Sequence, residues 1–235
     1  MKETKILREH HQKIHYSEDH WNLLRKKRKD AKELLQLFSK TGLKAYLFGS
    51  IARGDVHENS DIDLFIPDNI PSYQIEIILQ DKGYSHYFRE IIMATPKDTL
   101  KLYIYLSELE SITIPLSKFD RKSLEFYAFG GKIEINQLNN DVRVPGVNKR
   151  LVFIKPTEYG HEEYSIIGNE HIIAKQLNVS IDIVNERKKV LLKRESFGRT
   201  GVFLKRELTI QESVEEVLKE LANRKSIIRK KLFKK

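Results

Sequence analysis

The chain has 235 residues, of which 40% are hydrophobic, and its 42 Lys and Arg against 33 Asp and Glu give a net charge of +9. No run approaches the roughly 20 apolar residues of a membrane-spanning helix, and the lack of cysteine excludes disulfides and thiolate metal sites. The length fits two domains, and the positive charge favours a polyanionic partner.

The N-terminal half of the sequence alternates helix and strand patterns. Its first 15 residues lack the apolar stretch of a secretory signal, so we expect a cytoplasmic protein without a membrane partner. Apolar spacing predicts helices over 19–40, 72–80 and 122–129. Runs of β-branched, aromatic and other apolar residues predict strands over 45–48, 61–66, 84–95, 99–106 and 111–116. The double glycine at 130–131 is the predicted domain boundary.

The C-terminal half is more basic, and its first strands are predicted over 132–135 and 150–155. From residue 169 the spacing predicts two short helices, with Ser180 as the N-cap of the second, and then two strands, LLKRE and GVFLKREL, joined by a turn. A capping box at Thr209 and Glu212 begins the predicted last helix. The predicted domains are therefore 1–130, a β-rich connecting segment over 131–168, and 169–235.

Residues 49–63, GSIARGDVHENSDID, carry the most specific chemical pattern. A glycine between a strand and a helix start lets a phosphate approach backbone N–H donors, so Gly49 and Ser50 are predicted to hold a polyphosphate. Residues two apart on a strand share a face, so Asp61 and Asp63 point the same way. Two such carboxylates repel unless a cation lies between them, and their hard oxygen atoms suit Mg²⁺. The pattern predicts one site that combines metal and polyphosphate.

This stretch resembles the signature of the polymerase-beta superfamily of nucleotidyltransferases, which reads Gly-Ser, Ala-Arg-Gly, a short loop and Ser-Asp-x-Asp. The resemblance implies an α+β fold, a mixed sheet with helices. It also implies transfer of a nucleoside monophosphate from an NTP to a hydroxyl on two Mg²⁺ ions, with release of pyrophosphate. By this resemblance Asp61 and Asp63 bind the metals. The residues assigned to the nucleotide are Gly49, Ser50, Arg53 and Ser60.

The family also uses a third carboxylate, on a later strand, which binds the catalytic metal and helps to deprotonate the attacking hydroxyl. The clearest form of that strand is missing from this sequence. Glu90 is acidic, follows a predicted helix and lies in a predicted strand, so we assign this catalytic and metal-binding role to it. Glu108 and Glu110 are alternatives, and if Tyr103 occupies the position the site lacks its base.

The stretch HIIAKQLNVSIDIVNERKKVLLKR resembles a helix-turn-helix, and the two strands after it would make a winged-helix domain, smaller than the first. Its clustered cations predict salt-sensitive binding to DNA or RNA. The residues assigned to this contact are Lys188, Lys189, Arg194, Arg199, Lys205 and Arg206. The alternative is that the helix pair serves packing or dimerisation.

These patterns together favour a Mg²⁺-dependent enzyme that adds a nucleoside monophosphate to a hydroxyl acceptor, preferably on a nucleic acid. An alternative of another class is a DNA-binding regulator whose nucleotide site senses an NTP or is vestigial. Transfer to a protein or a small molecule is a third reading, which shares the same active site.

Overall fold

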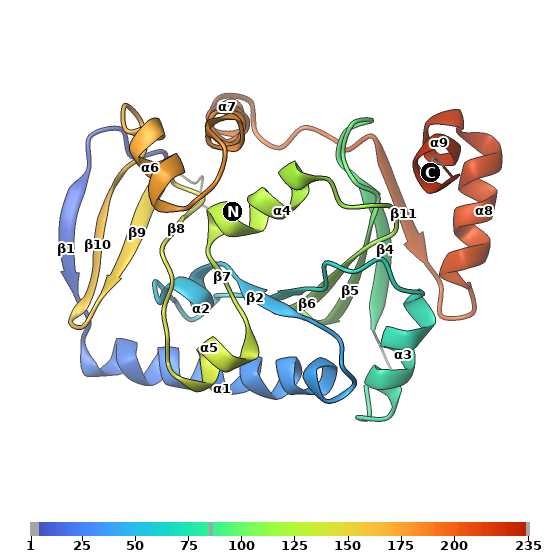
Figure 1. The fold of residues 1–235 in the computed structure, drawn as a ribbon, viewed down its shortest axis with the longest axis horizontal. Helices are drawn as coiled ribbons and strands as arrows, with labels where there is room; N and C mark the ends of the chain where they lie inside the picture. The colour runs from blue at the N-terminus through green and yellow to red at the C-terminus, as the bar shows by residue number, and fades with distance from the viewer. Residues whose placement is uncertain (1–4, 85–86, 234–235) are drawn as a thin grey trace.

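Two β-sheets organise the chain, and helices surround them (Figure 1). The computed structural model describes residues 5–84 and 87–233. Among these residues, no helix has both the length and the apolar character that crossing a membrane requires.

The larger sheet has seven strands in the order β11-β4-β5-β6-β3-β2-β7. Only β3 and β6 pair in parallel, and the other neighbours are antiparallel, so the predicted mixed sheet is confirmed. The strands are β2 (Tyr46–Phe48), β3 (Ile62–Phe65), β4 (Phe88–Met93), β5 (Lys101–Ser107), β6 (Glu110–Pro115), β7 (Lys132–Ile133) and β11 (Leu204–Leu208).

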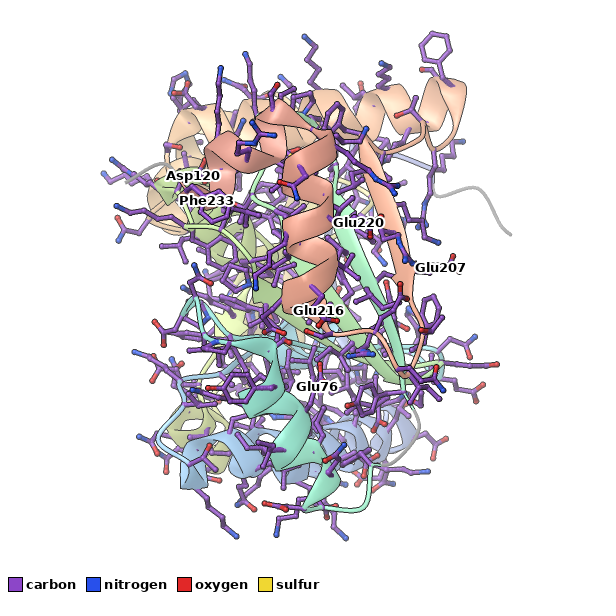
Figure 2. The ribbon with its side chains drawn as sticks, turned by 90° about the vertical axis from the view of Figure 1, so that its right-hand side faces the viewer. Glu76, Asp120, Glu207, Glu216, Glu220 and Phe233 are labelled. Atoms are coloured by element: carbon purple, nitrogen blue, oxygen red, sulfur yellow. The ribbon has the colours of Figure 1, made fainter. Side chains whose placement is uncertain are left out.

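Helices cover the apolar face of this sheet, where Leu47, Leu64 and Ile104 are completely buried. They are α1 (Glu18–Lys40), α3 (Ser72–Gln80), α5 (Ile135–Asn139), α8 (Val214–Arg224) and α9 (Ser226–Phe233). Figure 2 looks onto α8, with β11 beside it and α3 below. The long α1 forms as predicted because its apolar residues recur at helical spacing and Ser17 Oγ accepts a hydrogen bond from the N–H of His20 at its start.

The opposite face of the sheet carries α4 (Arg121–Gly130). Its Tyr127 stacks on Phe65 of β3 with 3.6 Å between ring centroids, and it meets Phe48 of β2 edge-on. The short helix α2 (Ser50–Arg53) follows β2 directly. On the α4 side of the sheet, the end of β2 and the start of β3 line a pocket.

The smaller sheet has the order β1-β10-β9-β8, and its strands are β1 (His11–His15), β8 (Gly146–Val147), β9 (Val152–Thr157) and β10 (Gly160–Ser165). It shares a second core with α6 (Glu170–Gln176) and α7 (Ile181–Phe197), to which α4 contributes Phe129. As predicted, Ser180 caps α7, because its Oγ accepts a hydrogen bond from the N–H of Ile183. Helix α4 thus joins the two cores.

The strand β8 passes very close to the end of α4. A Cβ atom on Gly146 would lie 2.6 Å from the carbonyl carbon of Gly130 and from the nitrogen of Gly131. Only a residue without a side chain fits there. This contact fixes where the connection from β8 to β9, residues 148–151, begins.

The predicted wing does not form. Residues 191–195, predicted as a strand, continue α7, because Leu191 follows Ile183 and Val184 at helical spacing and is buried in the second core with them. The second predicted strand is present as β11, but it pairs with β4 of the large sheet, where Leu204 and Leu208 are buried.

The C-terminal helical region also differs from the prediction. The N–H of Thr209 donates to Glu212 Oε2 at 2.8 Å, so the predicted capping pair closes a turn, and α8 begins later, capped by Ser213. The helix then breaks at Lys225, and α9 follows.

Hydrogen-bonded strands cross both predicted domain boundaries. The segment 1–130 contributes β1 to the small sheet, and 131–168 contributes β7 to the large one. The segment 169–235 contributes β11, which extends the large sheet beyond β4. Residues 1–130, 131–168 and 169–235 therefore do not form separate sheets.

Candidate active site

The site is built from the turn between β2 and α2. Gly49 has φ 93° and ψ −150°, which disfavours residues with a side chain, and the space where its Cβ would lie is open. Its N–H donates to the carbonyl oxygen of Gly131 at 2.9 Å. The turn therefore faces open space, but the Gly49 N–H is already used within the protein and does not serve a phosphate.

Two serines fix the loop that follows. Ser50 Oγ donates to Ser60 Oγ at 3.1 Å, and Ser60 Oγ accepts a hydrogen bond from the N–H of His57 at 2.9 Å. Lys27 Nζ donates to the carbonyl oxygen of Ser60 at 2.9 Å. Ser60 is buried, and these contacts give it a positioning role in the loop that precedes the aspartate pair.

Arg53, predicted to contact the nucleotide, is engaged inside the protein. Its guanidinium donates to both carboxylate oxygens of Asp55, at 2.9 and 3.0 Å, and to the carbonyl oxygen of Gly130 at 2.6 Å. The Arg53 side chain is only 6% exposed. This residue ties α2 to the end of α4 and so shapes the site from behind.

The two aspartates lie at the start of β3, as the alternation of the strand predicts. Asp61 is exposed, Ile62 and Leu64 are buried in the core, and Asp63 accepts a hydrogen bond from Ser111 Oγ at 2.6 Å. Burial raises the pKa of Asp63, and the neighbouring charge of Asp61 raises it further, whereas the Ser111 hydrogen bond and the charge of Lys149 lower it. Asp63 thus holds a charge that the protein compensates only in part.

These residues share one pocket with a volume of 520 Å³, within the size range of small-molecule sites. Six of the seven residues predicted to act on metal or nucleotide line it: Gly49, Ser50, Arg53, Ser60, Asp61 and Asp63. The seventh, Glu90, does not.

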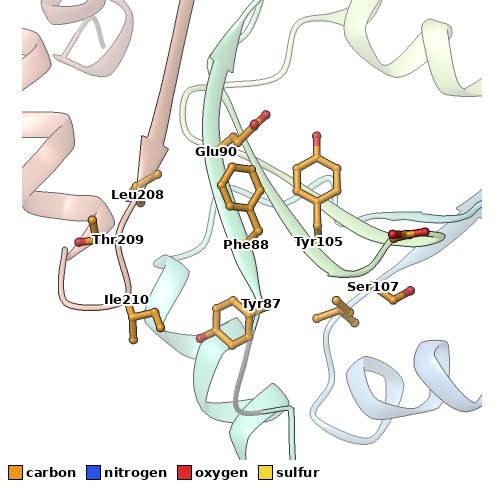
Figure 3. A pocket seen from close by; sticks show the side chains of 10 residues that line it. Tyr87, Phe88, Glu90, Tyr105, Ser107, Leu208, Thr209 and Ile210 are labelled. Carbon is orange, nitrogen blue, oxygen red and sulfur yellow. The ribbon is translucent and has the colours of Figure 1, made fainter.

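Glu90 lies on β4, which is separated from β3 by β5 and β6, or about 14 Å at the usual strand spacing. Its carboxylate pairs with Lys205 Nζ at 2.8 Å, and it lines a different, open cavity together with Phe88 and Tyr105 (Figure 3). The prediction that Glu90 supplies the third carboxylate is therefore wrong for this arrangement. Sequence order placed it after the correct helix, but it could not give the order of strands in the sheet.

The alternatives to Glu90 do not reach Asp63 either. The strand beside β3 is β6, and Ser111 is the β6 residue in register with Asp63. Glu110 is in register with Ile62 and so belongs to the other face, and Glu108 lies in the turn before β6. Tyr103 lies on β5, one strand further away. A serine thus occupies the position next to Asp63 where a third carboxylate could lie.

The residues predicted to contact nucleic acid are divided between two regions. Lys189, Arg194 and Arg199 are exposed on or just after α7. Lys188 pairs with Glu170 at 2.5 Å. Lys205 and Arg206 are on β11, in the other sheet, where they pair with acidic residues, Lys205 with Glu90 and Glu207 and Arg206 with Glu212.

Sequence reasoning missed three cations that line the pocket opposite the Gly49 turn: Lys149, Arg150 and Arg187. A signal for Arg187 was available. On α7 it lies between Val184 and Leu191 at helical spacing, on the face that is otherwise apolar and buried. The adjacent Lys149 and Arg150 carry no such signal, because a loop imposes no periodicity.

Asp61 and Asp63 are the residues that could hold a divalent cation. Within residues 5–84 and 87–233, no group of three or more His, Cys, Asp or Glu side chains is arranged to bind a metal. Mg²⁺ suits such a site, because it binds through one or two carboxylates and completes its coordination with substrate phosphates and water. The charge of Asp63, which the protein compensates only in part, fits this requirement.

Comparison with known families matches residues 24–131 to the family model described as "Nucleotidyltransferase domain". No curated protein and no solved structure matches the chain. The matched segment runs from α1 to the end of α4 and contains the glycine turn and both aspartates. The pocket residues Lys149, Arg150 and Arg187 lie outside it. Residues 24–131 are therefore similar to a nucleotidyltransferase domain.

Proposed function

We propose that this protein is a Mg²⁺-dependent nucleotidyltransferase, which transfers a nucleoside monophosphate from an NTP to an acceptor hydroxyl and releases pyrophosphate. The observation that carries the proposal is the meeting of the Gly49-Ser50 turn with Asp61 and Asp63 in one pocket. The family match over residues 24–131 supports the same reaction class.

In this proposal each pocket residue has a separate role. Ser50 binds the triphosphate, for which the open space beside Gly49 leaves room, whereas Arg53 and Ser60 hold the turn and loop in place. Asp61 and Asp63 would hold Mg²⁺, which when bound stabilises negative charge on the phosphates.

The proposed acceptor is a nucleic acid. The chain carries a net charge of +9, and Lys189, Arg194 and Arg199 are exposed, the first two on α7 and the third just after it. Such cations attract phosphate backbones in a salt-dependent way. Lys188, Lys205 and Arg206 already have acidic partners and contribute less to this surface.

The test is transfer of label from each of the four α-³²P-labelled NTPs, with Mg²⁺, to a mixed RNA and DNA acceptor pool. We expect labelled nucleic acid from the native protein and a loss of about 100-fold or more for Asp63→Asn, as for removal of a group that acts on the transition state. Asp68→Asn is the matched control, because Asp68 is exposed in the loop after β3 and does not line the pocket. Equal transfer by native protein and Asp63→Asn would contradict the proposal.

One observation favours a second candidate function, a regulator that binds an NTP without transferring it. Ser111 stands beside Asp63 where a carboxylate could lie, and the other acidic side chains of the pocket are engaged, Asp55 with Arg53 and Glu163 with two histidines. Binding of an NTP without label transfer to nucleic acid, protein or small-molecule acceptors, together with sequence-selective duplex binding, would support this function instead.

A further inference from the structure

The wall of the pocket opposite the glycine turn is cationic. Arg187 comes from α7, and Lys149 and Arg150 come from the connection between β8 and β9. Both segments lie after residue 131, so the family match does not assign them any role. They nevertheless line the same 520 Å³ as Asp61 and Asp63.

Arg187 is a half-buried cation for which the protein supplies no ion-pair partner among the described residues. In the described part of the chain its guanidinium makes no ion pair, and its Nε is buried without a hydrogen-bond partner. The guanidinium lies over the ring of Phe126, 4.8 Å from the ring centroid. Burial and, to a smaller extent, the charge of Arg194 lower the pKa of Arg187, and Glu186 raises it; the result is about 10, so the side chain stays positive at neutral pH.

Two carboxylates near Arg187, those of Glu186 and Glu163, are engaged with other residues. Glu186, its neighbour on α7, pairs with Lys122. Glu163, which also lines the pocket, accepts hydrogen bonds from His10 and His161 at 2.5 and 3.2 Å. A half-buried guanidinium without an anionic partner has lost part of its hydration without compensation, and a ligand that supplies the anion provides that compensation.

The backbone of the loop that carries Lys149 and Arg150 is also held in position. Asn148 fixes the turn, because its Oδ1 accepts hydrogen bonds from the N–H groups of Arg150 at 2.9 Å and Val152 at 3.2 Å. Lys149 lines the same pocket as Asp61 and Asp63. Lys149 and Arg150 are exposed, so they can move towards a ligand without losing packing.

We propose that Arg187, assisted by Lys149 and Arg150, binds the polyphosphate of the NTP across the pocket from Gly49 and Ser50. This rests on the proposed function, and it adds that α7, whose sequence resembles a DNA-reading helix, forms part of the wall of the nucleotide pocket. An arginine is well suited to this role, because its planar donors bind phosphate oxygens in pairs. Several adjacent phosphates are required to engage cations on two separate segments, which favours a triphosphate over a single phosphodiester of an acceptor.

The experiment is calorimetric titration of the full-length protein with inorganic tripolyphosphate, which carries the phosphates without a base, in the presence of Mg²⁺. We expect Arg187→Gln to weaken binding by about 10- to 100-fold, the effect of losing a hydrogen bond to a charged group, and Arg187→Lys to weaken it less. Lys193→Gln is the matched control, because Lys193 is exposed on the same helix and does not line the pocket. Its affinity should stay within about twofold of the native value.

The inference would be overturned if the native protein did not bind tripolyphosphate, or if Arg187→Gln bound it with the affinity of the native protein. It would also be overturned if Arg187→Gln weakened the binding of an oligonucleotide and left tripolyphosphate binding unchanged. If Arg187→Gln does not fold, Lys149→Gln keeps the test decisive, because an exposed loop residue can be replaced without loss of packing; a smaller loss of affinity is expected. Label transfer is measured on the same samples. A native protein that binds tripolyphosphate through Arg187 but transfers no label would contradict the proposed reaction and support this inference.

Discussion

Arg53 illustrates how a residue of the motif can serve the site without facing the substrate. Its side chain is almost fully buried and bridges Asp55 and the carbonyl oxygen of Gly130. The pattern Gly-Ser-x-Ala-Arg-Gly identifies the turn, but spacing alone could not distinguish an arginine that binds phosphate from one that braces the turn. The hydrogen bonds of Arg53 favour bracing.

Replacing Arg53 by alanine should therefore reduce stability before it reduces chemistry. Because Asp55 would be left without its partner in a site where it is 14% exposed, we expect a loss of about 3–5 kcal/mol in the free energy of unfolding, measured by urea denaturation. Arg25→Ala removes an exposed ion pair with Glu18 and should cost less than about 1 kcal/mol. Unchanged stability of Arg53→Ala combined with lost NTP binding would instead identify Arg53 as a direct ligand.

At Asp63 we expect a conflict between the stability of the folded protein and the charge that metal binding requires. Folding raises its pKa above the ordinary 3.8, so this residue favours the folded state below that value, and the advantage is lost as the pH rises through the raised pKa. At neutral pH the folded protein thus carries a buried charge at a net cost. Asparagine removes the charge and still accepts the hydrogen bond from Ser111.

We therefore expect Asp63→Asn to melt at a higher temperature than the native protein at neutral pH, with the difference shrinking as the pH falls towards 3.8. Thermal melts across this pH range, without Mg²⁺ or NTP, measure it. The same variant should show no stabilisation by added Mg²⁺ and NTP, unlike the native protein. A lower melting temperature at neutral pH would show that the carboxylate contributes to stability.

Among the elements, β11 and the turn after it depend on one side chain. Arg89 of β4 is 4% exposed, and its Nη1 pairs with Glu76 of α3 at 2.9 Å. Its Nη2 donates to the carbonyl oxygens of Thr209 at 2.6 Å and Glu212 at 3.0 Å. Arg89 therefore joins α3, β4 and the connection to α8.

Arg89→Met should loosen the C-terminal segment more than the rest of the chain. We expect a loss of about 3–5 kcal/mol, because the partly buried carboxylate of Glu76 and three carbonyl groups lose their donor, and early proteolytic cleavage between residues 209 and 213. Urea denaturation and limited proteolysis followed by mass spectrometry measure both. Arg224→Met, which removes an exposed pair with Glu220, is the control, and cleavage in it should follow the native pattern.

Elements defined by local pattern could be predicted, whereas their partners could not. The stripe of α1 and the alternation at Asp61–Asp63 are readable because each is a periodicity within a short window. The five residues LLKRE are too short to show a periodicity of their own, and they are helical because Leu191 continues the buried face of α7. Glu90 was misplaced for a related reason, since sheet order is set by contacts between distant residues.

At the scale of the whole molecule, each of the two sheets contains strands from distant parts of the sequence. The family match ends at residue 131, yet the pocket is completed by Lys149, Arg150 and Arg187 from later segments. The motif could therefore be found from sequence, but the far wall of its pocket could not, because no local signal links residues 49–63 to α7. Because β7 and β11 come from after residue 130, the large sheet cannot be completed by the first 130 residues alone.

Residues 1–130 expressed alone should not fold. They would lack β7 beside β2 and β11 beside β4, and the apolar face that α8 and α9 cover would be exposed. We expect a fragment that aggregates, or that lacks the cooperative thermal transition of the full chain, as followed by circular dichroism. A soluble fragment that melts cooperatively would show that the first 130 residues are an independent domain.

The contact of Gly146 with Gly130 and Gly131 leads to a different kind of expectation. If position 146 were randomised and the variants selected for binding, we expect glycine to be recovered almost alone. Even a methyl group would force β8 away from α4 and displace the loop of Lys149 and Arg150. The neighbourhood's least replaceable position would then be one that never meets a substrate, and a survey of mutational tolerance would mark it as strongly as the aspartates.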